Sequence, residues 1–278
     1  MIVVTGATGN VGRSLLKTLA RTSAVTAVSR GQLPVDLPEG VRYQQADLAQ
    51  PDTLRPAVDG AHTLFLLVAG AGAHLDVNQI LKVSQAGGIE RVVLLSSQAA
   101  GTRPRSVSHA PLRAIERVAE SSGLAWTILR PGGFASNMYA WADLVRAQRT
   151  VAAPFGDVGL PVIDPEDIAD VAAAVLKEDT HAGHIYELTG PALSTPRQRA
   201  ADLAAALGEP IHFVEQTRDE ARAQLLRFMP EPVVDGTLSI LGEPTPAEQR
   251  ISPHVQQLLG RPPHTFAHWA ERHVNAFR

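Results

Sequence analysis

Cysteine is absent from this chain of 278 residues. The chain therefore has no disulfide, no thiolate nucleophile and no metal site built from cysteine ligands. An excess of positive charge is also missing, since 25 lysines and arginines stand against 28 acids and the formal net charge is −3. Such a balance gives no general attraction for nucleic acid or for an anionic membrane surface. We expect neither as a partner.

Long apolar runs and a basic leader are missing as well. No apolar run approaches the ~20 residues that a membrane span needs. The first residues, Met-Ile-Val-Val-Thr-Gly, already predict a strand, and no positively charged segment stands before them. Apolar residues make up 45% of the chain and charged residues 19%, which is typical of a globular protein with a full core. We expect a cytoplasmic protein.

A glycine-rich turn follows the first predicted strand. Residues 2–5 are a short β-branched run, and Gly6-Ala-Thr-Gly9-Asn-Val-Gly12 comes directly after them. Gly6 suits a tight turn, Gly9 lets a diphosphate approach the backbone, and Gly12 lets the next helix pack against the strand. That helix, predicted over 11–19, would direct its free N–H groups at the anion. The sequence therefore predicts a dinucleotide site with contacts from Gly6, Thr8, Gly9, Asn10, Val11 and Gly12.

Strands and helices alternate through the first half of the chain. Strand-type runs occupy residues 25–30, 41–47, 63–68, 91–97 and 126–130, and helical candidates lie at 51–58, 74–86 and 108–122. This alternation implies a parallel sheet with right-handed crossovers. We predict an α/β fold with a Rossmann-type, doubly wound sheet, whose ligand crevice lies at the carboxyl ends of the strands.

The regular alternation of predicted strands and helices ends after residue 130. Gly132 and Gly133 open a region predicted to be irregular, in which residues 151–162 are a short segment that contains proline and glycine. A capped helix and a strand are predicted after it, at 164–176 and 184–189. Beyond them the predicted helices are 196–207, 218–228, 255–259 and 266–277, with one strand at 211–214. We expect a nucleotide-binding core over 1–150, to which 160–190 return, and a smaller, mostly helical substrate-side region over 191–278.

With these elements placed, the chain resembles the NmrA-like, atypical branch of the short-chain dehydrogenase/reductase family along nearly its whole length. The resemblance rests on the glycine motif, on Asp47-Leu48, Ser96-Ser97 and Arg130-Pro131-Gly-Gly-Phe134-x-x-Asn137, on Asp164-x-x-Asp167 and on Thr265-Phe-x-x-Trp269. Members of this family include NADPH-dependent quinone reductases, isoflavone-type reductases and cofactor-sensing regulators without chemistry. The resemblance therefore implies the fold more firmly than the activity.

The end of the second strand bears on cofactor preference. An NAD site usually presents an acid there, whereas Ser29-Arg30 offers a hydroxyl and a guanidinium suited to a 2′-phosphate. We expect NADP(H), with NAD(H) as the second choice; the alternative is that Arg30 is a solvated loop residue. Asp47 resembles the acid that meets the adenine amino group, or else it caps a turn. The resemblance adds Leu48, Val68, Ala69, Ser96 and Pro131 to the expected cofactor contacts.

Catalysis departs from the family pattern. Most short-chain dehydrogenases use a Tyr-x-x-x-Lys pair, in which the lysine lowers the pKa of the tyrosine. Here the residues four positions after the three tyrosines are Asp47, Asp143 and Gly190, so the sequence does not contain the pair. Near the expected place stands His109-Ala-Pro-Leu-Arg113, whose ends share one helix face. His109 is our candidate proton donor, with a surface histidine at a helix start as the alternative.

Further candidates come from the strand ends. Ser97 follows the fifth strand, where the family keeps a hydroxyl near the nicotinamide, or it caps a turn. The chain crosses the crevice after Pro131, so the expected substrate-pocket residues are Phe134, Asn137, Met138 and Tyr139. We expect no metal, because the spacing of His264, His268 and His273 on the last helix is typical of a solvated face.

The leading hypothesis is an NAD(P)H-dependent oxidoreductase, with NADPH preferred, that reduces a small apolar quinone, enone or carbonyl-type acceptor by hydride transfer. A quinone can take its proton from solvent, which would make the missing Tyr/Lys pair tolerable. The alternative is a non-catalytic NADP(H) sensor of the NmrA type that couples cofactor occupancy to a partner. A nucleotide-sugar epimerase is disfavoured because its chemistry needs the same tyrosine. The sequence leaves a homodimer open.

Overall fold

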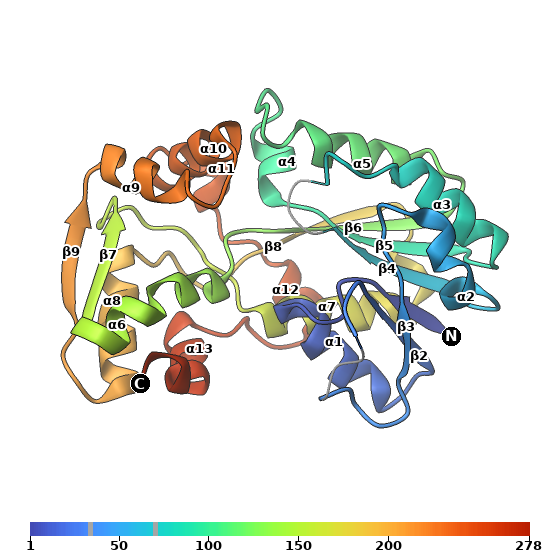
Figure 1. Ribbon diagram of the computed structural model, residues 1–278, viewed down its shortest axis with the longest axis horizontal. Helices are drawn as coiled ribbons and strands as arrows, with labels where there is room; N and C mark the ends of the chain where they lie inside the picture. Colours follow the sequence, from blue (N-terminus) through green and yellow to red (C-terminus); the bar gives the residue numbers. More distant parts are fainter. Residues whose placement is uncertain (33–35, 69–71) are drawn as a thin grey trace. The chain divides into compact units, whose positions relative to one another are not determined.

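The computed structural model describes residues 1–32, 36–68 and 72–278 and forms two compact units (Figure 1). Unit 1 comprises Met1–Pro104, His109–Pro131 and Pro165–Glu187, and unit 2 comprises Arg105–Ser108, Gly132–Asp164 and Leu188–Arg278. The domain boundaries expected near residues 150 and 190 stay a prediction.

Unit 1 is built on a seven-stranded sheet in the order β3-β2-β1-β4-β5-β6-β8 (Figure 1). Its strands are β1 (Ile2–Val4), β2 (Val25–Ser29), β3 (Arg42–Gln45), β4 (Thr63–Leu67), β5 (Arg91–Leu95), β6 (Ala125–Pro131) and β8 (His184–Leu188). Strands β1 to β6 pair in parallel. The strand order reverses between β1 and β4, and ligands of such sheets bind at this reversal. The predicted Rossmann-type fold is confirmed.

Helices cover both faces of this sheet. They are α1 (Asn10–Ala20), η1 (Pro51–Leu54), α2 (Arg55–Val58), α3 (Val77–Ala86), α4 (Gln98–Thr102), α5 (Ala110–Glu120), α7 (Pro165–Lys177) and η3 (Asp179–His181). Helix α1 packs along α7 on one face, whereas α3 packs on η1 and α5 on the other (Figure 1). Leu64 and Leu66 are two positions apart on β4, so their side chains lie on the same face of the sheet. They share a core with Ile80 and Ile115.

Unit 2 is mostly helical, as predicted for the C-terminal part of the chain. Its helices are η2 (Ala135–Trp141), α6 (Ala142–Gln148), α8 (Pro196–Leu207), α9 (Arg218–Leu225), α10 (Glu231–Gly242), α11 (Pro246–Gln249), α12 (His254–Leu259), α13 (Phe266–His273) and η4 (Val274–Phe277). Its main core brings Val145 and Val151 against Leu203, Trp269 and Phe277. Residues from the two longer sequence segments of the unit, Gly132–Asp164 and Leu188–Arg278, thus share one core.

Several elements of unit 2 differ from the sequence-based expectation, since η2, α6, β7, α10 and α11 were not predicted. The segment expected to be irregular contains β7 (Thr150–Pro154), which pairs in parallel with β9 (His212–Gln216), so a distant partner supplies the hydrogen bonds. Helix α10 was not predicted, because Pro232 and Gly236 both lower its propensity. Pro232 lies in the first turn, where proline is tolerated, and a Cβ at Gly236 would come 2.3 Å from Oγ of Ser108. Close packing, not local propensity, accounts for that glycine.

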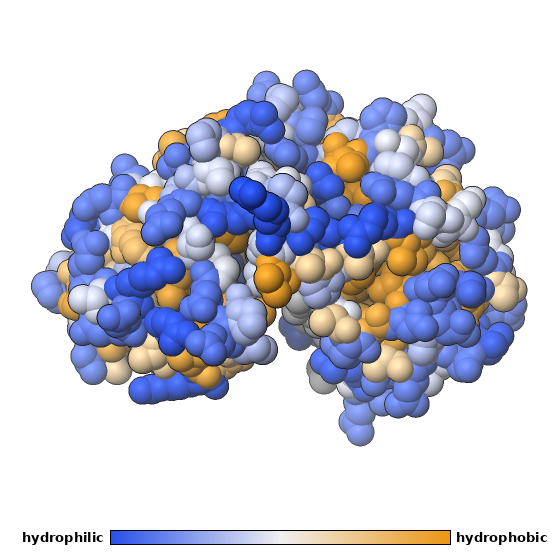
Figure 2. Space-filling view, turned by 90° about the horizontal axis from the view of Figure 1, so that it is seen from above, coloured by the Kyte–Doolittle hydropathy of each residue, from blue (hydrophilic) through white to orange (hydrophobic). Residues whose placement is uncertain are grey.

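Hydrophilic side chains cover most of the face shown in Figure 2. Among the exposed large apolar side chains, Phe228 (76%) and Val107 (75%) are the most accessible. Within the described ranges, no helix combines the length and the apolar character needed to cross a membrane.

Candidate functional site

Hydrogen bonds to neighbouring strands fix the start of the glycine-rich turn. The hydroxyl of Thr5 donates to the carbonyl oxygens of Phe65 and Leu67, at 3.1 Å each, and accepts from the Leu67 amide at 2.8 Å. The Ala7 amide donates to the Val28 carbonyl at 3.2 Å. The turn is therefore held at the carboxyl ends of β1, β2 and β4, where the strand order reverses.

Two glycines of the turn are required by the fold itself. Gly6 has φ +63°, in the left-handed region that favours glycine. A Cβ at Gly12 would come 2.2 Å from the carbonyl oxygen of Gly6 and 2.8 Å from the Cα of Ala7. Both are backbone atoms, so glycine is needed at position 12 for helix α1 to approach the turn this closely.

Gly9 is different, because the fold does not require it. Its φ of −80° and ψ of 174° are open to any residue, and the nearest atom that a Cβ would meet is the Gly6 oxygen, at an ordinary 3.4 Å. Gly9 is also the N-cap of α1 and has no side chain that could accept from the first N–H groups of that helix. An exposed, uncovered helix start beside a small residue fits a phosphate group.

A buried hydroxyl ends β2, and an exposed cation follows it. Ser29 is 9% exposed, and its hydroxyl lies 3.0 Å from that of Tyr43, which also donates to the Gly31 carbonyl. Arg30 is exposed, and its carbonyl accepts from Nε2 of Gln45 at 2.9 Å. The hydroxyl of Ser29 is thus engaged within the fold, whereas the Arg30 guanidinium faces solvent.

Asp47 holds a turn. Its Oδ1 accepts from the Ala49 amide at 3.0 Å, and its own amide donates to the hydroxyl of Thr53 at 2.9 Å. Leu48, beside it, packs against the core of unit 1. These contacts match the turn-capping alternative for Asp47, and a contact with adenine stays a prediction. Of the two residues expected after β4, Val68 is buried and Ala69 lies outside the described residues.

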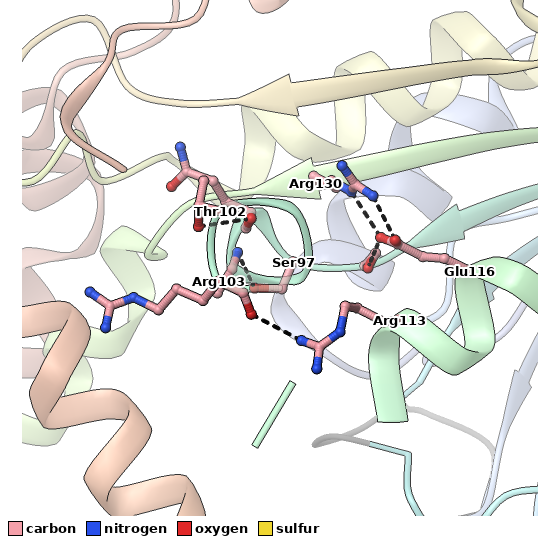
Figure 3. Close-up of polar contacts among 9 residues, drawn as sticks. Ser97, Thr102, Arg103, Arg113, Glu116 and Arg130 are labelled. Atoms are coloured by element: carbon pink, nitrogen blue, oxygen red, sulfur yellow. Dashed lines mark hydrogen bonds and ion pairs between the residues drawn. The ribbon is translucent and has the colours of Figure 1, made fainter. Parts of the chain in front are cut away.

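A buried ion pair joins the ends of β5 and β6 to helix α5 (Figure 3). Arg130 donates from Nε and Nη2 to the two carboxylate oxygens of Glu116, at 2.9 and 2.7 Å, and the hydroxyl of Ser96 donates to Oε1 at 2.5 Å. The hydrogen bond with Glu116 raises the pKa of the Arg130 guanidinium, against the opposing effect of burial. A Cβ at Gly101 would come 2.6 Å from Nη1 of Arg130. The pair therefore fixes the end of β6.

The catalytic candidates both lie at helix starts. Ser97 is the N-cap of α4, and its Oγ accepts from the Ala99 amide at 3.3 Å. His109 is half-buried and is the N-cap of α5; its carbonyl accepts from the Arg113 amide at 3.1 Å. The guanidinium of Arg113 donates to the carbonyl of Arg103 at 3.1 Å (Figure 3). Ser97 caps α4 with its side chain, whereas His109 contributes its backbone carbonyl to the start of α5. The catalytic roles of both residues stay predictions.

The segment after β6 carries the expected substrate-pocket residues. Pro131 is buried at the end of β6, Phe134 and Met138 are half-buried, and Asn137 is exposed. Met138 and Tyr139 pack against the main core of unit 2. All four pocket candidates belong to unit 2, whereas the cofactor and catalytic candidates belong to unit 1.

Tyr139 forms the most specific contacts of this group. Its hydroxyl lies 2.8 Å from Nδ1 of His273, and its ring centroid lies 5.1 Å from that of Trp269. Burial raises the pKa of the Tyr139 phenol, Asp164 raises it further and Arg272 opposes the rise. The side chain thus helps to hold α13 against the rest of unit 2. A contact with substrate remains a prediction.

The structure gathers most of the cofactor candidates at one edge of the sheet. Pro131 lies at the carboxyl end of β6, and the glycine turn, Arg30, Asp47, Val68 and Ser96 follow the carboxyl ends of the other parallel strands. Sequence reasoning missed Glu116. The available signal was an acid among the apolar positions of the predicted helix, followed by an arginine at the end of the next strand.

Known proteins similar to this chain share its length and fold. A family model described as NAD(P)H-binding matches residues 6–179. The chain is 34% identical to a (4-alkanoyl-5-oxo-2,5-dihydrofuran-3-yl)methyl phosphate reductase of Streptomyces griseus and 28% identical to an NAD(P)H azoreductase of Xenophilus azovorans; each match covers 100% of this chain and 99% of the relative. The crystal structure of an NADPH-dependent quinone oxidoreductase of Escherichia coli, complexed with NADPH, has a TM-score of 0.81 and 25% identity, over 98% of this chain and 99% of that one.

Proposed function

Because the chain belongs to the NAD(P)H-binding family, we propose that it is an NADPH-preferring reductase of a small, conjugated acceptor such as a quinone or an enone. The observation that carries this proposal is the glycine turn at the strand-order reversal. There the structure explains Gly6 and Gly12 by its own packing and leaves Gly9 to be explained by a ligand.

Different residues around that turn would bind different parts of the cofactor. The start of α1 and Gly9 would bind the diphosphate, Asp47 and Leu48 would border the adenine, and Val68, Ser96 and Pro131 would line the nicotinamide half. The exposed guanidinium of Arg30 would bind the 2′-phosphate, which favours NADPH over NADH. When bound, the cofactor supplies the hydride.

The names of the relatives support the class of acceptor. They describe a reductase of a dihydrofuranone that carries an alkanoyl group and a phosphate, an azoreductase and a quinone oxidoreductase. Each acceptor so named has an unsaturated, electron-poor centre. We infer that this chain also reduces such a centre, and that Phe134, Asn137, Met138 and Tyr139 contribute to acceptor binding.

Proton supply follows from what the sequence contains. With no Tyr-x-x-x-Lys motif, the chain would act mainly by orienting the acceptor and excluding water. His109 would donate a proton where the acceptor needs one, and Ser97 would offer a hydrogen bond. A reduced quinone anion can take its proton from water, so such an acceptor would depend little on either residue.

A screen of NADPH consumption tests this proposal and separates it from a cofactor sensor. Quinones, enones, azo compounds and aldehydes would be offered with NADPH, and cofactor binding would be titrated in parallel. We expect turnover with at least one class and tighter binding of NADPH than of NADH. Tight binding without turnover on any acceptor would favour the sensor, and absence of binding would refute both.

A further inference from the structure

A second cation lies beside the glycine-rich turn. Arg13, on the first turn of α1, donates from Nε to the carbonyl of Thr8 at 2.9 Å and from Nη1 to Oδ2 of Asp36 at 3.0 Å. Thr8 belongs to the glycine-rich turn, and Asp36 belongs to the connection between β2 and β3. In a Rossmann-type sheet these two segments flank the adenosine ribose. The Arg13–Asp36 pair therefore stands where the 2′-substituent of the ribose would lie.

The pair is open to solvent and to exchange of partners. The side chains of Arg13 and Asp36 are 54% and 55% exposed, so their mutual attraction is weak. They border a small hollow lined by Ala7, Thr8, Arg13, Leu16, Lys17, Asp36, Leu37 and Pro38. A phosphate carries about two negative charges and accepts hydrogen bonds from a guanidinium in a matched geometry. Such a group would compete well with one exposed carboxylate.

The position of the acid supports this assignment. An NAD site usually presents its acid directly at the end of the second strand, where it can bind both ribose hydroxyls. Here that position is Arg30, and the acid comes six residues later, already paired with Arg13. An acid so neutralised is poorly placed to select for NADH.

Resting on the proposed function, we propose that Arg13 is a second ligand for the 2′-phosphate of NADP(H) and that Asp36 is the counter-ion which the phosphate displaces. The hydrogen bond to Thr8 keeps the Arg13 guanidinium in place during the exchange. Asp36 then sets how strongly the protein prefers NADPH, because its carboxylate competes with the 2′-phosphate for the Arg13 guanidinium.

The experiment compares Asp36→Asn and Arg13→Gln with the parent in titrations of 2′,5′-ADP, 5′-AMP, NADPH and NADH, at low salt. Asp36→Asn should tighten binding of 2′,5′-ADP and NADPH by about two- to fivefold. Arg13→Gln should weaken both by about tenfold or more. Binding of 5′-AMP and NADH should stay as in the parent. In the double variant the gain from Asp36→Asn should vanish, since it acts through Arg13.

Asp179→Asn is the matched control. Asp179 is an exposed acid paired with Arg91, at the amino end of β5 and so at the opposite edge of the sheet. This variant removes the same charge and should change no affinity. Equal effects on the ligands with and without a 2′-phosphate, or no effect of Arg13→Gln, would overturn the inference about Arg13. The proposed function would still stand in that case, provided that the parent protein binds NADPH. A parent that binds neither NADPH nor 2′,5′-ADP would instead refute the proposed function.

Discussion

Gly9→Val should abolish binding of NADP(H) while the fold survives. The backbone at Gly9 lies in a region open to any residue, and the nearest atom to an added Cβ is 3.4 Å away. The new side chain would nevertheless stand over the first N–H groups of α1. An incoming diphosphate could then no longer reach them.

The size of the loss follows from those N–H groups. A hydrogen bond to a charged group contributes about 1.5–3 kcal/mol, so two lost contacts amount to about 3–6 kcal/mol. That corresponds to binding weaker by about 10²–10⁴-fold. The cost to the fold should be much smaller, since exchanging glycine for valine at an N-cap costs about 1 kcal/mol.

Gly12→Ala is the informative control. Its Cβ would come 2.2 Å from the Gly6 carbonyl oxygen, so the helix would have to move, and this variant should unfold at a clearly lower temperature than the parent. Thermal unfolding with and without NADPH, together with calorimetric titration, measures both quantities. A Gly9→Val protein that binds NADPH like the parent would refute the proposed diphosphate site. One that melts as low as Gly12→Ala would refute the argument from packing.

Three further predictions concern the cofactor preference, the proton donor and the buried ion pair. Arg30→Ala should weaken NADPH binding about tenfold or more and leave NADH binding unchanged; equal losses would show that Arg30 does not contact the 2′-phosphate. His109→Ala should lower turnover on a carbonyl acceptor by ~10²–10⁴-fold, with a small effect on a quinone and none on NADPH affinity. A small, uniform effect would reduce His109 to a helix-start residue. Glu116→Gln should lower the free energy of unfolding by about 3–5 kcal/mol, because it leaves the charge of Arg130 without its partner. The same loss in Glu120→Gln, an exposed acid one turn later, would contradict that reasoning.

The parallel sheet was predictable because its signals are local. Apolar runs such as the one that forms β4 mark buried strands, and the spacing of Gly6, Gly9 and Gly12 marks the turn and the helix after it. Helix α8 has the bounds that were predicted for it, Pro196–Leu207, and the structure shows a complete capping box at its start, between Thr195 and Gln198. In these segments local preference and tertiary structure agree.

Contacts between distant residues were beyond such reasoning. Strand β7 depends on β9, some sixty positions later, and nothing within Thr150–Pro154 indicates that partner. The partner of Arg130 was equally hidden, since Glu116 lies on another element and an acid on a helix usually faces solvent. The same holds for Ser29, whose hydroxyl contacts Tyr43 on a neighbouring strand. A contact of this hydroxyl with the cofactor stays a prediction. The partner of a side chain on another element is determined by tertiary packing. The residues next to that side chain in the sequence do not indicate it.

The way unit 1 is assembled has a consequence for the order of folding during synthesis. The chain leaves this unit after Pro131 and returns at Pro165, with α7 and then the edge strand β8. Unit 1 can therefore be completed only once α7 has emerged to cover α1 and the sheet. Residues 132–164 are synthesised before α7 but pack into their core later than α7 does. The side chains on which they pack, Trp269 among them, lie near the end of the chain. Until then this segment is exposed to solvent and to neighbouring chains. Premature termination after residue 187 should therefore yield a folded sheet with an unpacked segment that is prone to aggregation.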